Sequence, residues 1–203
     1  FACAAALAAM SQPATLSIAA LPTPSDAPGP SSLAGQLLIA SPDMGDPRFY
    51  HAVILMVQHD ANGALGIMIN RLLGERSMAS VLKAVGEKDP GASGSARIFI
   101  GGPVQTDAGF VLHSPDYHRD DTVAIAGFVS MTSSREILRD IADNKGPKKS
   151  LIAFGYAGWG AGQLENEMRL HGWYTTEADE KIVFDDDRDK VWDEAIKRRT
   201  QDL

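Results

Sequence analysis

The sequence contains a single cysteine, Cys3, in 203 residues. One cysteine excludes an internal disulfide and any zinc site built on cysteine pairs. The chain also lacks an apolar run approaching the roughly 18 residues that a membrane-spanning helix needs. Apolar residues nevertheless make up 44% of the chain, which is enough for a sizeable core. We therefore expect a folded protein without a membrane segment, and the cysteine usage is typical of the cytoplasm.

Basic residues are the scarcer charge, with 19 Lys and Arg against 26 Asp and Glu and a formal net charge of −7. Such a balance repels a nucleic acid backbone at long range. The sequence also shows no helix-turn-helix segment with a basic recognition helix. Direct DNA binding is therefore not expected.

The common catalytic motifs are missing. The sequence has no Gly-x-Ser-x-Gly elbow, no Walker lysine motif, no His-Glu-x-x-His and no Cys-x-x-Cys. Cys3 lies close to the beginning of the chain, and no serine has a recognisable activating context. We expect no covalent nucleophile, no cofactor and no metal.

Residues 1–32 differ in composition from the rest of the chain. They are small, apolar or rich in Pro and Ser, carry no charge before Asp26 and show no sustained period. We expect a flexible tail here and a single domain over residues 33–203. Residues 1–9 could be the remnant of a signal peptide or an extension upstream of a start at Met10. The second interpretation is favoured because no basic region precedes the apolar stretch.

Short apolar runs and helical patterns alternate from Gln36 onward. Strands are expected at 37–40, 51–58, 65–69, 97–100, 110–113, 123–126, 151–154, 173–175 and 182–184. Helices are expected at 78–85, after a capping box formed by Ser133 and Glu136, at 163–170 and from about Asp189. The turn signal at 60–63 predicts a hairpin. Hairpins outnumber strand-helix-strand units, so an α+β fold with a mixed, largely antiparallel sheet is expected.

Residues 151–168, LIAFGYAGWGAGQLENEM, resemble a strand that passes through a glycine-rich turn into a helix, a pattern that can hold phosphate. The dinucleotide fingerprint fails because Gln163 stands where the third glycine belongs. Glu165 and Glu167 in the first turns would also repel an anion and favour the helix start themselves. We predict that Trp159 packs in this turn, with Gln163 and Glu165 beside it.

Several polar residues remain as candidates for a site. His113 and His118 flank Ser-Pro-Asp-Tyr; a metal loop is one interpretation, and a turn with solvent-facing histidines is favoured. His59 is expected to bond a nearby backbone group, with catalysis as the alternative. Arg71 could meet a carboxylate or phosphate, although a surface ion pair is favoured. Gly101 and Gly102 predict a tight bend or close backbone packing.

Four further blocks of residues follow one another along the chain: Ala40–Met44 with Asp46, Pro47 and Phe49; His59 with Gly63–Gly66 and Asn70–Arg71; Gly101–Val104 with Gly109–His113; and Gly155–Trp159 with Gly162–Glu165 and Trp173. Taken together and in this order, the blocks resemble the bacterial YqgE/AlgH family. The resemblance runs from about Leu33 to Arg199. Two positions depart from the family pattern: Leu72 replaces a common proline, and His171 replaces a common asparagine.

The resemblance implies a bifurcated sheet curled into a pseudo-barrel with surrounding helices. It also implies a protein of uncharacterised biochemistry, often labelled a candidate transcriptional regulator of alginate production, without established catalytic residues. We therefore expect a regulatory or binding protein that contacts a protein or small ligand without catalysis. The alternative is a hydrolase-like or other acid-base enzyme that uses His59, Asn70, His113 and Glu165 without a covalent nucleophile. The residues expected to line a shared cleft are His59, Asn70, Arg71, Gly101, Gly102, His113, Trp159, Gln163 and Glu165.

Overall fold

The structure, a computed structural model, describes residues 32–88, 91–184 and 187–200. Nearly all of the predicted tail lies outside these residues. The strands are β1 (Gln36–Ala40), β2 (Val53–Asp60), β3 (Gly63–Met68), β4 (Leu72–Ser77), β5 (Ser95–Ile100), β6 (Val104–His113), β7 (Val123–Ala126), β8 (Val129–Thr132), β9 (Ser150–Gly160) and β10 (Trp173–Glu177). The helices are α1 (Met78–Ala84), α2 (Glu136–Ala142), α3 (Gln163–Arg169), α4 (Glu180–Phe184) and α5 (Val191–Lys197).

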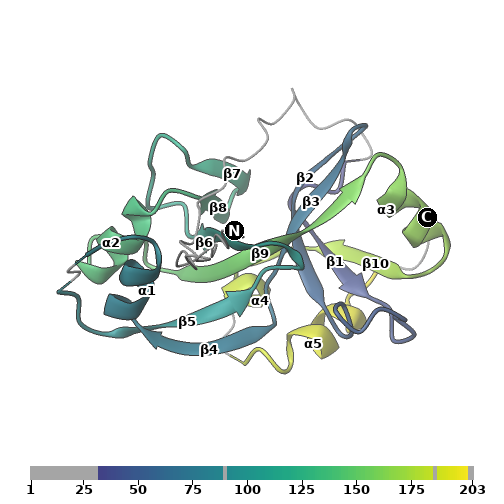
Figure 1. Ribbon diagram of the computed structural model, residues 1–203. Coiled ribbons are helices and arrows are strands. Elements are labelled where there is room, and N and C mark those ends of the chain that lie inside the picture. The colour runs from purple at the N-terminus through teal and green to yellow at the C-terminus, as the bar shows by residue number, and fades with distance from the viewer. Residues whose placement is uncertain (1–31, 89–90, 185–186, 201–203) are drawn as a thin grey trace, which may run out of the picture.

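The described strands form one branched sheet that curls into a half-barrel (Figure 1). Its main path is β10-β1-β2-β3-β9-β6-β8-β7, and β4 and β5 branch from β9. All pairs on the main path are antiparallel, whereas β5 pairs with β9 in parallel. This arrangement confirms the expected α+β class and the largely antiparallel, bifurcated sheet.

Strand β9 joins the two branches because it is long enough to have different neighbours along its length. Residues 152–154 pair with β5 on one side and with β6 on the other. The link from β5 to β6 must therefore cross over β9 within three residues. A Cβ atom on Gly101 would lie 2.2 Å from the carbonyl oxygen of Gly155, and one on Gly102 would lie 2.1 Å from the carbonyl carbon of Tyr156. Close backbone packing, one of the two expectations for these glycines, is confirmed.

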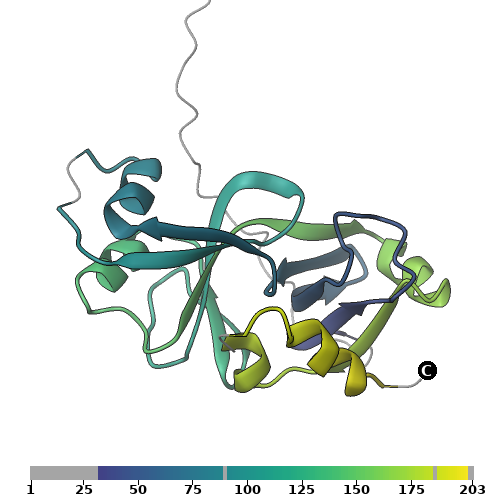
Figure 2. The same cartoon turned by 90° about the horizontal axis from the view of Figure 1, so that it is seen from below.

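Alternating side chains of β1 and β2 enter two cores on opposite faces of the sheet. Leu37 and Leu55 join one core, which α4 and α5 cover through Ile182 and Val191. Figure 2 shows these two helices lying together below the sheet. Leu38 and its neighbours join the second core, which α3 covers. A third cluster packs α1 and α2 against the β5–β9–β6 region.

Two expectations about local structure are wrong. Residues 182–184 belong to helix α4 rather than to a strand, because the Asp179 carboxylate accepts the Ile182 N–H at 2.8 Å and starts a helical turn. The capping box of Ser133 and Glu136 does not form. The backbone N–H groups of Ser133 and Ser134 instead donate to the Asp121 carboxylate, at 3.0 and 2.7 Å.

Two strands were not expected at all. Strand β4 is largely exposed, and its two apolar residues, Leu72 and Leu73, are consecutive, so it carries no apolar alternation. Strand β8 is fully buried but only four residues long. None of the helices in the described ranges has the length and apolar character needed to cross a membrane.

Candidate functional site

His59 connects the beginning of the described chain to helix α3. Its Nδ1 accepts the backbone N–H of Leu33 at 3.1 Å, which confirms the expected bond to a nearby backbone group. The proton of the neutral ring must therefore sit on Nε2, which donates to Glu165 Oε1 at 2.8 Å. The pKa of Glu165 is lowered, first by a hydrogen bond from its own backbone N–H and then by His59.

Glu167 joins the two tryptophans that flank α3. The indole N–H groups of Trp159 and Trp173 both donate to its Oε2, at 2.9 and 2.8 Å. Gln163 Nε2 donates to the other oxygen, and Gln163 Oε1 accepts the N–H of Gly160. Both indoles are almost fully buried, and Phe49 packs against each of them. Trp159 therefore packs as predicted. Glu167 fixes the two indoles through these hydrogen bonds, and the sequence did not indicate this role.

The glycine turn after β9 does not present an open helix start to an anion. Helix α3 has seven residues, and the left-handed Gly162 precedes it. The Gln163 side chain already occupies the Gly160 N–H. The Glu165 carboxylate lies in the first turn. Glu165 therefore occupies the helix start as predicted, whereas the same role predicted for Glu167 is wrong, because its carboxylate accepts the two indole N–H groups instead.

Asn70 and Arg71 hold the loop between β1 and β2. The Asn70 side-chain amide accepts the Val53 N–H at 2.9 Å and donates to the His51 carbonyl at 2.8 Å. The Arg71 guanidinium donates to the carbonyl oxygens of Arg48 and Tyr50, at 2.9 and 2.8 Å. The surface ion pair favoured for Arg71 is therefore wrong, because backbone oxygens take the place of a carboxylate.

His113 is fully buried, so the expectation of a solvent-facing imidazole is wrong at this position, whereas His118 is exposed. The His113 ring nitrogens lie 2.9 Å from the Ser114 carbonyl oxygen and 2.9 Å from the Thr132 hydroxyl. Burial is the main cause that lowers the pKa of His113. A neutral, fully bonded imidazole of this kind supports the end of β6. In the described residues no group of His, Cys, Asp and Glu side chains has a geometry that could hold a metal ion.

The candidate residues thus fall into separate networks. His59 and Glu165 bond each other, whereas Asn70 and His113 each bond groups elsewhere in the fold. Gln163 and Trp159 belong to the Glu167 network beside the first pair. The four side chains of the acid-base alternative do not meet in one hydrogen-bonded cluster.

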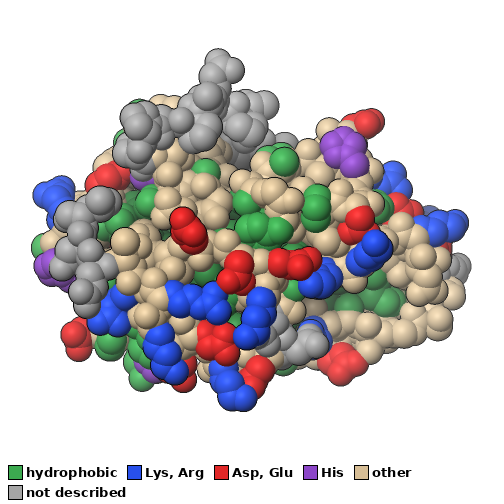
Figure 3. Space-filling view, turned by 180° about the vertical axis from the view of Figure 1, so that it is seen from behind, with side chains coloured by type: hydrophobic (Ala, Val, Ile, Leu, Met, Phe, Trp, Pro, Cys, Tyr) green, Lys and Arg blue, Asp and Glu red, His purple; other side chains and the backbone are tan. Residues whose placement is uncertain are grey.

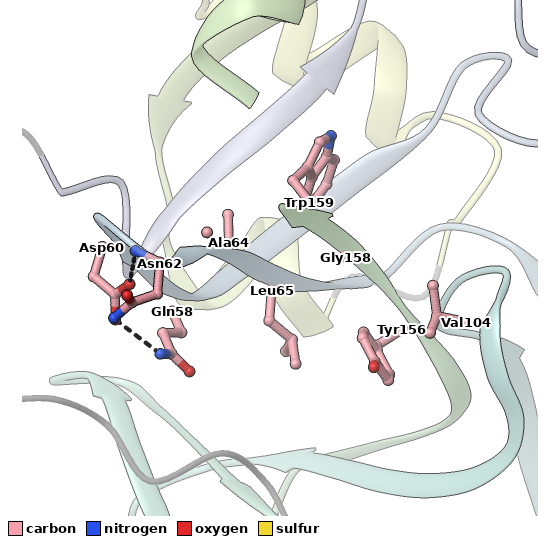
Figure 4. Close-up of a pocket in the computed structure, with 10 residues that line it drawn as sticks. Gln58, Asp60, Asn62, Ala64, Leu65, Val104, Tyr156, Gly158 and Trp159 are labelled. Carbon is pink, nitrogen blue, oxygen red and sulfur yellow. Dashed lines mark hydrogen bonds between the residues drawn. The ribbon is translucent and has the colours of Figure 1, made fainter. Parts of the chain in front are cut away.

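An open groove of about 390 Å³ lies along β3 and the end of β9, with Gly158 and Trp159 among the residues that line it (Figure 4). Leu65, Val104 and Tyr156 form its apolar floor and wall. Gln58, Asp60 and Asn62 form a polar rim, in which Gln58 and the Asn62 N–H each donate to the Asp60 carboxylate. Figure 4 shows the side chains of Gln58, Leu65 and Tyr156 on the same side of the ribbon, with Trp159 on the other.

Glycines create this groove because of the two-residue period of the strands. Gly63 stands opposite Gly160, and Leu65 stands opposite Gly158, so three positions on this face have no side chain. A Cβ on Gly158 would lie 3.0 Å from the Tyr156 ring, which lies over this position. A Cβ on Gly160 would meet only the Gln163 oxygen, at 4.0 Å. Gly158, with Gly63 opposite the end of β9, therefore shapes a hollow on this face.

The half-barrel, with its long shared strand and backbone crossing, defines a fold that solved structures share. The solution structure of AlgH from Pseudomonas aeruginosa matches with a TM-score of 0.71 and 40% identity over 86% of this chain and 92% of that one. A crystal structure from Corynebacterium diphtheriae, 22% identical, has the same fold, with a TM-score of 0.64 over 87% and 90% of the two chains.

The sequence comparisons then give the family. The family model described as AlgH-like matches residues 37–203, and the chain belongs to this family. A UPF0301 protein of Rhizorhabdus wittichii is 45% identical over 83% of this chain and 90% of its own length. A UPF0301 protein of Novosphingobium aromaticivorans is 46% identical over 82% and 89%. The resemblance inferred from the four blocks is confirmed.

Proposed function

We propose that this protein is a regulatory binding protein that acts without catalysis and holds an extended segment of a partner protein in the groove beside β9. One observation carries the non-catalytic part. Both ring nitrogens of His59 and of His113 are already hydrogen-bonded within the fold, and so is the Asn70 amide. A general acid or base needs an atom that can exchange a proton with the ligand.

The open edge of β9 supports an extended polypeptide as the ligand. β3 and β6 flank β9, but Val104, opposite Tyr156, is the first residue of β6. Residues 157–160 pair with β3 only, so within the described ranges their other edge has no strand partner, and of these residues Gly160 already donates its N–H to Gln163. An exposed edge can accept a further strand through main-chain hydrogen bonds. The apolar floor at Leu65 and Tyr156 would then take alternate side chains of that strand.

The acid-base alternative rests on the His59–Glu165 pair. A carboxylate 2.8 Å from an imidazole nitrogen orients the ring in many catalytic sites. Here, however, Nδ1 faces the Leu33 N–H, and the side chain of His59 is only 9% exposed.

Direct DNA binding has less support. On the face in Figure 3, acidic and basic side chains are intermixed rather than gathered by sign.

The groove can be obstructed at its end, where Gly160 stands opposite the lining residue Gly63. Gly160→Leu places a side chain beside the groove, at a position where a Cβ atom has room. Gly45→Leu is the matched control, because nothing lies within 4 Å of a Cβ at that exposed position. Peptides selected from a displayed random library should bind the native protein and the control equally, and bind Gly160→Leu at least about tenfold more weakly. Equal binding by all three proteins would refute the groove as the site.

A further inference from the structure

Three rings form a stack at the edge of a second hollow, away from the groove. The His51 ring lies between those of Tyr50 and Trp192, with centroids 4.0 and 3.9 Å apart and interplanar angles of 15° and 11°. The Trp192 indole N–H donates to the Ala40 carbonyl at 2.9 Å, which fixes the inner end of the stack to β1. Tyr50 forms the outer end and is 53% exposed.

The backbone holds this stack in an uncommon conformation. His51 has a φ of 53°, in the left-handed region that residues other than glycine seldom occupy. The Asn70 amide and the Arg71 guanidinium maintain the loop through the carbonyls of His51 and Tyr50. Strained residues that the surrounding structure holds in place cluster at binding sites. The stack is therefore positioned before any ligand arrives.

The hollow beside the stack measures about 540 Å³ and combines rings, apolar side chains and charge. Leu72 lines it and is 48% exposed. Leu72 and Tyr50, which both line this hollow, are two of the four exposed large hydrophobic residues in the described ranges. Exposed apolar side chains gathered at one place indicate an interaction site.

Arg71 gives this hollow a preference for an anion. A guanidinium has five N–H donors, and Arg71 uses two atoms for backbone carbonyls without a carboxylate partner. Asp187, Asp189 and Asp193 also line the hollow and disfavour a ligand with several negative charges. Arg97 and Arg188, which complete the charged lining, have interaction partners of their own.

We infer that this hollow binds a planar aromatic ring that carries one negative charge. The ligand ring stacks on the exposed face of Tyr50 and so adds a further ring to the stack of Tyr50, His51 and Trp192. The anionic group lies beside Arg71 and accepts its remaining N–H donors. An aromatic monocarboxylate has both features, whereas a nucleoside triphosphate carries too much charge for the three aspartates.

Saturation-transfer NMR and calorimetry with matched probes test this inference. Indole-3-acetate has the ring and the charge, 3-methylindole lacks the charge, and cyclohexaneacetate lacks the planar ring. Indole-3-acetate should bind at low millimolar concentration or better, and the other two should each bind at least about fivefold more weakly, as the loss of one stacking or charged contact implies. ATP should bind more weakly than indole-3-acetate.

Variants locate the binding. Tyr50→Ala should weaken indole-3-acetate binding about fivefold or more, whereas Leu170→Ala, at an exposed leucine on the turn after α3, should leave it unchanged. Asp193 lies on α5, outside the loop that carries Tyr50 and His51. Asp193→Asn should strengthen indole-3-acetate binding about twofold, because it removes one negative charge that repels the carboxylate. Cyclohexaneacetate binding as tightly as indole-3-acetate, an unaffected Tyr50→Ala, or no binding of indole-3-acetate would each overturn the proposal. None of these results bears on the groove beside β9.

Discussion

Glu165 and Glu167 provide a matched pair because they lie on the same short helix and differ mainly in their partners. Glu167 accepts both indole N–H groups, from Trp159 at 7% and Trp173 at 4% exposure. Glu167→Ala leaves two buried donors unpaired. Each unsatisfied donor costs about 1–3 kcal/mol, so the expected loss is about 2–6 kcal/mol of the free energy of unfolding.

Glu165→Ala removes the contact with His59 and the carboxylate's hydrogen bond from its own backbone N–H, and the side chain of Glu165 is 50% exposed. Solvent screens such a contact, so the expected loss is about 0.2–1 kcal/mol. Urea unfolding followed by far-UV circular dichroism measures both variants without relying on tryptophan emission, which the substitution at Glu167 itself would change. Glu167→Gln keeps one oxygen that can accept both indoles, and its loss should fall between the two. A Glu165→Ala variant as unstable as Glu167→Ala would refute the structural role assigned to Glu167.

Further expected outcomes concern the tail, anions and pH. A chain that begins at Ser32 should melt within a few degrees of the full chain, since residues 1–31 have little apolar pattern to pack; a larger loss would show that they dock on the domain. ATP, NAD and phosphate should not raise the melting temperature, and a shift of several degrees would restore a phosphate site at Gly158–Gly162. No sequence-specific footprint on duplex DNA should appear at physiological salt, because the net charge is −7; one that survives competitor DNA would contradict this. Burial raises the pKa of Asp121, but hydrogen bonds from Ser134 and Ser133 outweigh it, and the pKa is lowered below its ordinary 3.8. The free energy of unfolding that the Asp121 carboxylate contributes is therefore present above that value and lost as the pH falls below it. Asp121→Asn should make the fall in the free energy of unfolding with decreasing pH less steep.

Local signals in the sequence predicted the fold well where neighbouring residues decide the structure. The turn at 60–63 gave the β2–β3 hairpin because Asp60 itself accepts the Asn62 N–H. The prediction at 182–184 was wrong because a short apolar run is compatible with a strand or a helix, and the Asp179 cap decided between them. The capping box at Ser133 was wrong because Asp121, twelve residues earlier, accepts the Ser133 N–H that the Glu136 side chain would have bonded.

The candidate site was less predictable because it depends on strand register. His59 on β2 and Glu165 on α3 are 106 positions apart, and the pairing of β2 with β3 and of β3 with β9 brings the end of β2 close to α3. Glu167 carried no signal in the sequence beyond its place on a helix, since its role needs two tryptophans from β9 and β10. The stack of Tyr50, His51 and Trp192 likewise joins a loop to the last helix across the fold.

Photo-crosslinking in cells tests most directly whether the groove beside β9 holds a partner protein. A photoreactive amino acid replaces the exposed Asn62 at the groove rim, and in a control it replaces the exposed Lys197 on α5. We predict a discrete crosslinked product from position 62 that disappears when Gly160→Leu obstructs the groove and is absent from position 197. The same products from both positions, or a product at position 62 that persists with Gly160→Leu, would contradict the account.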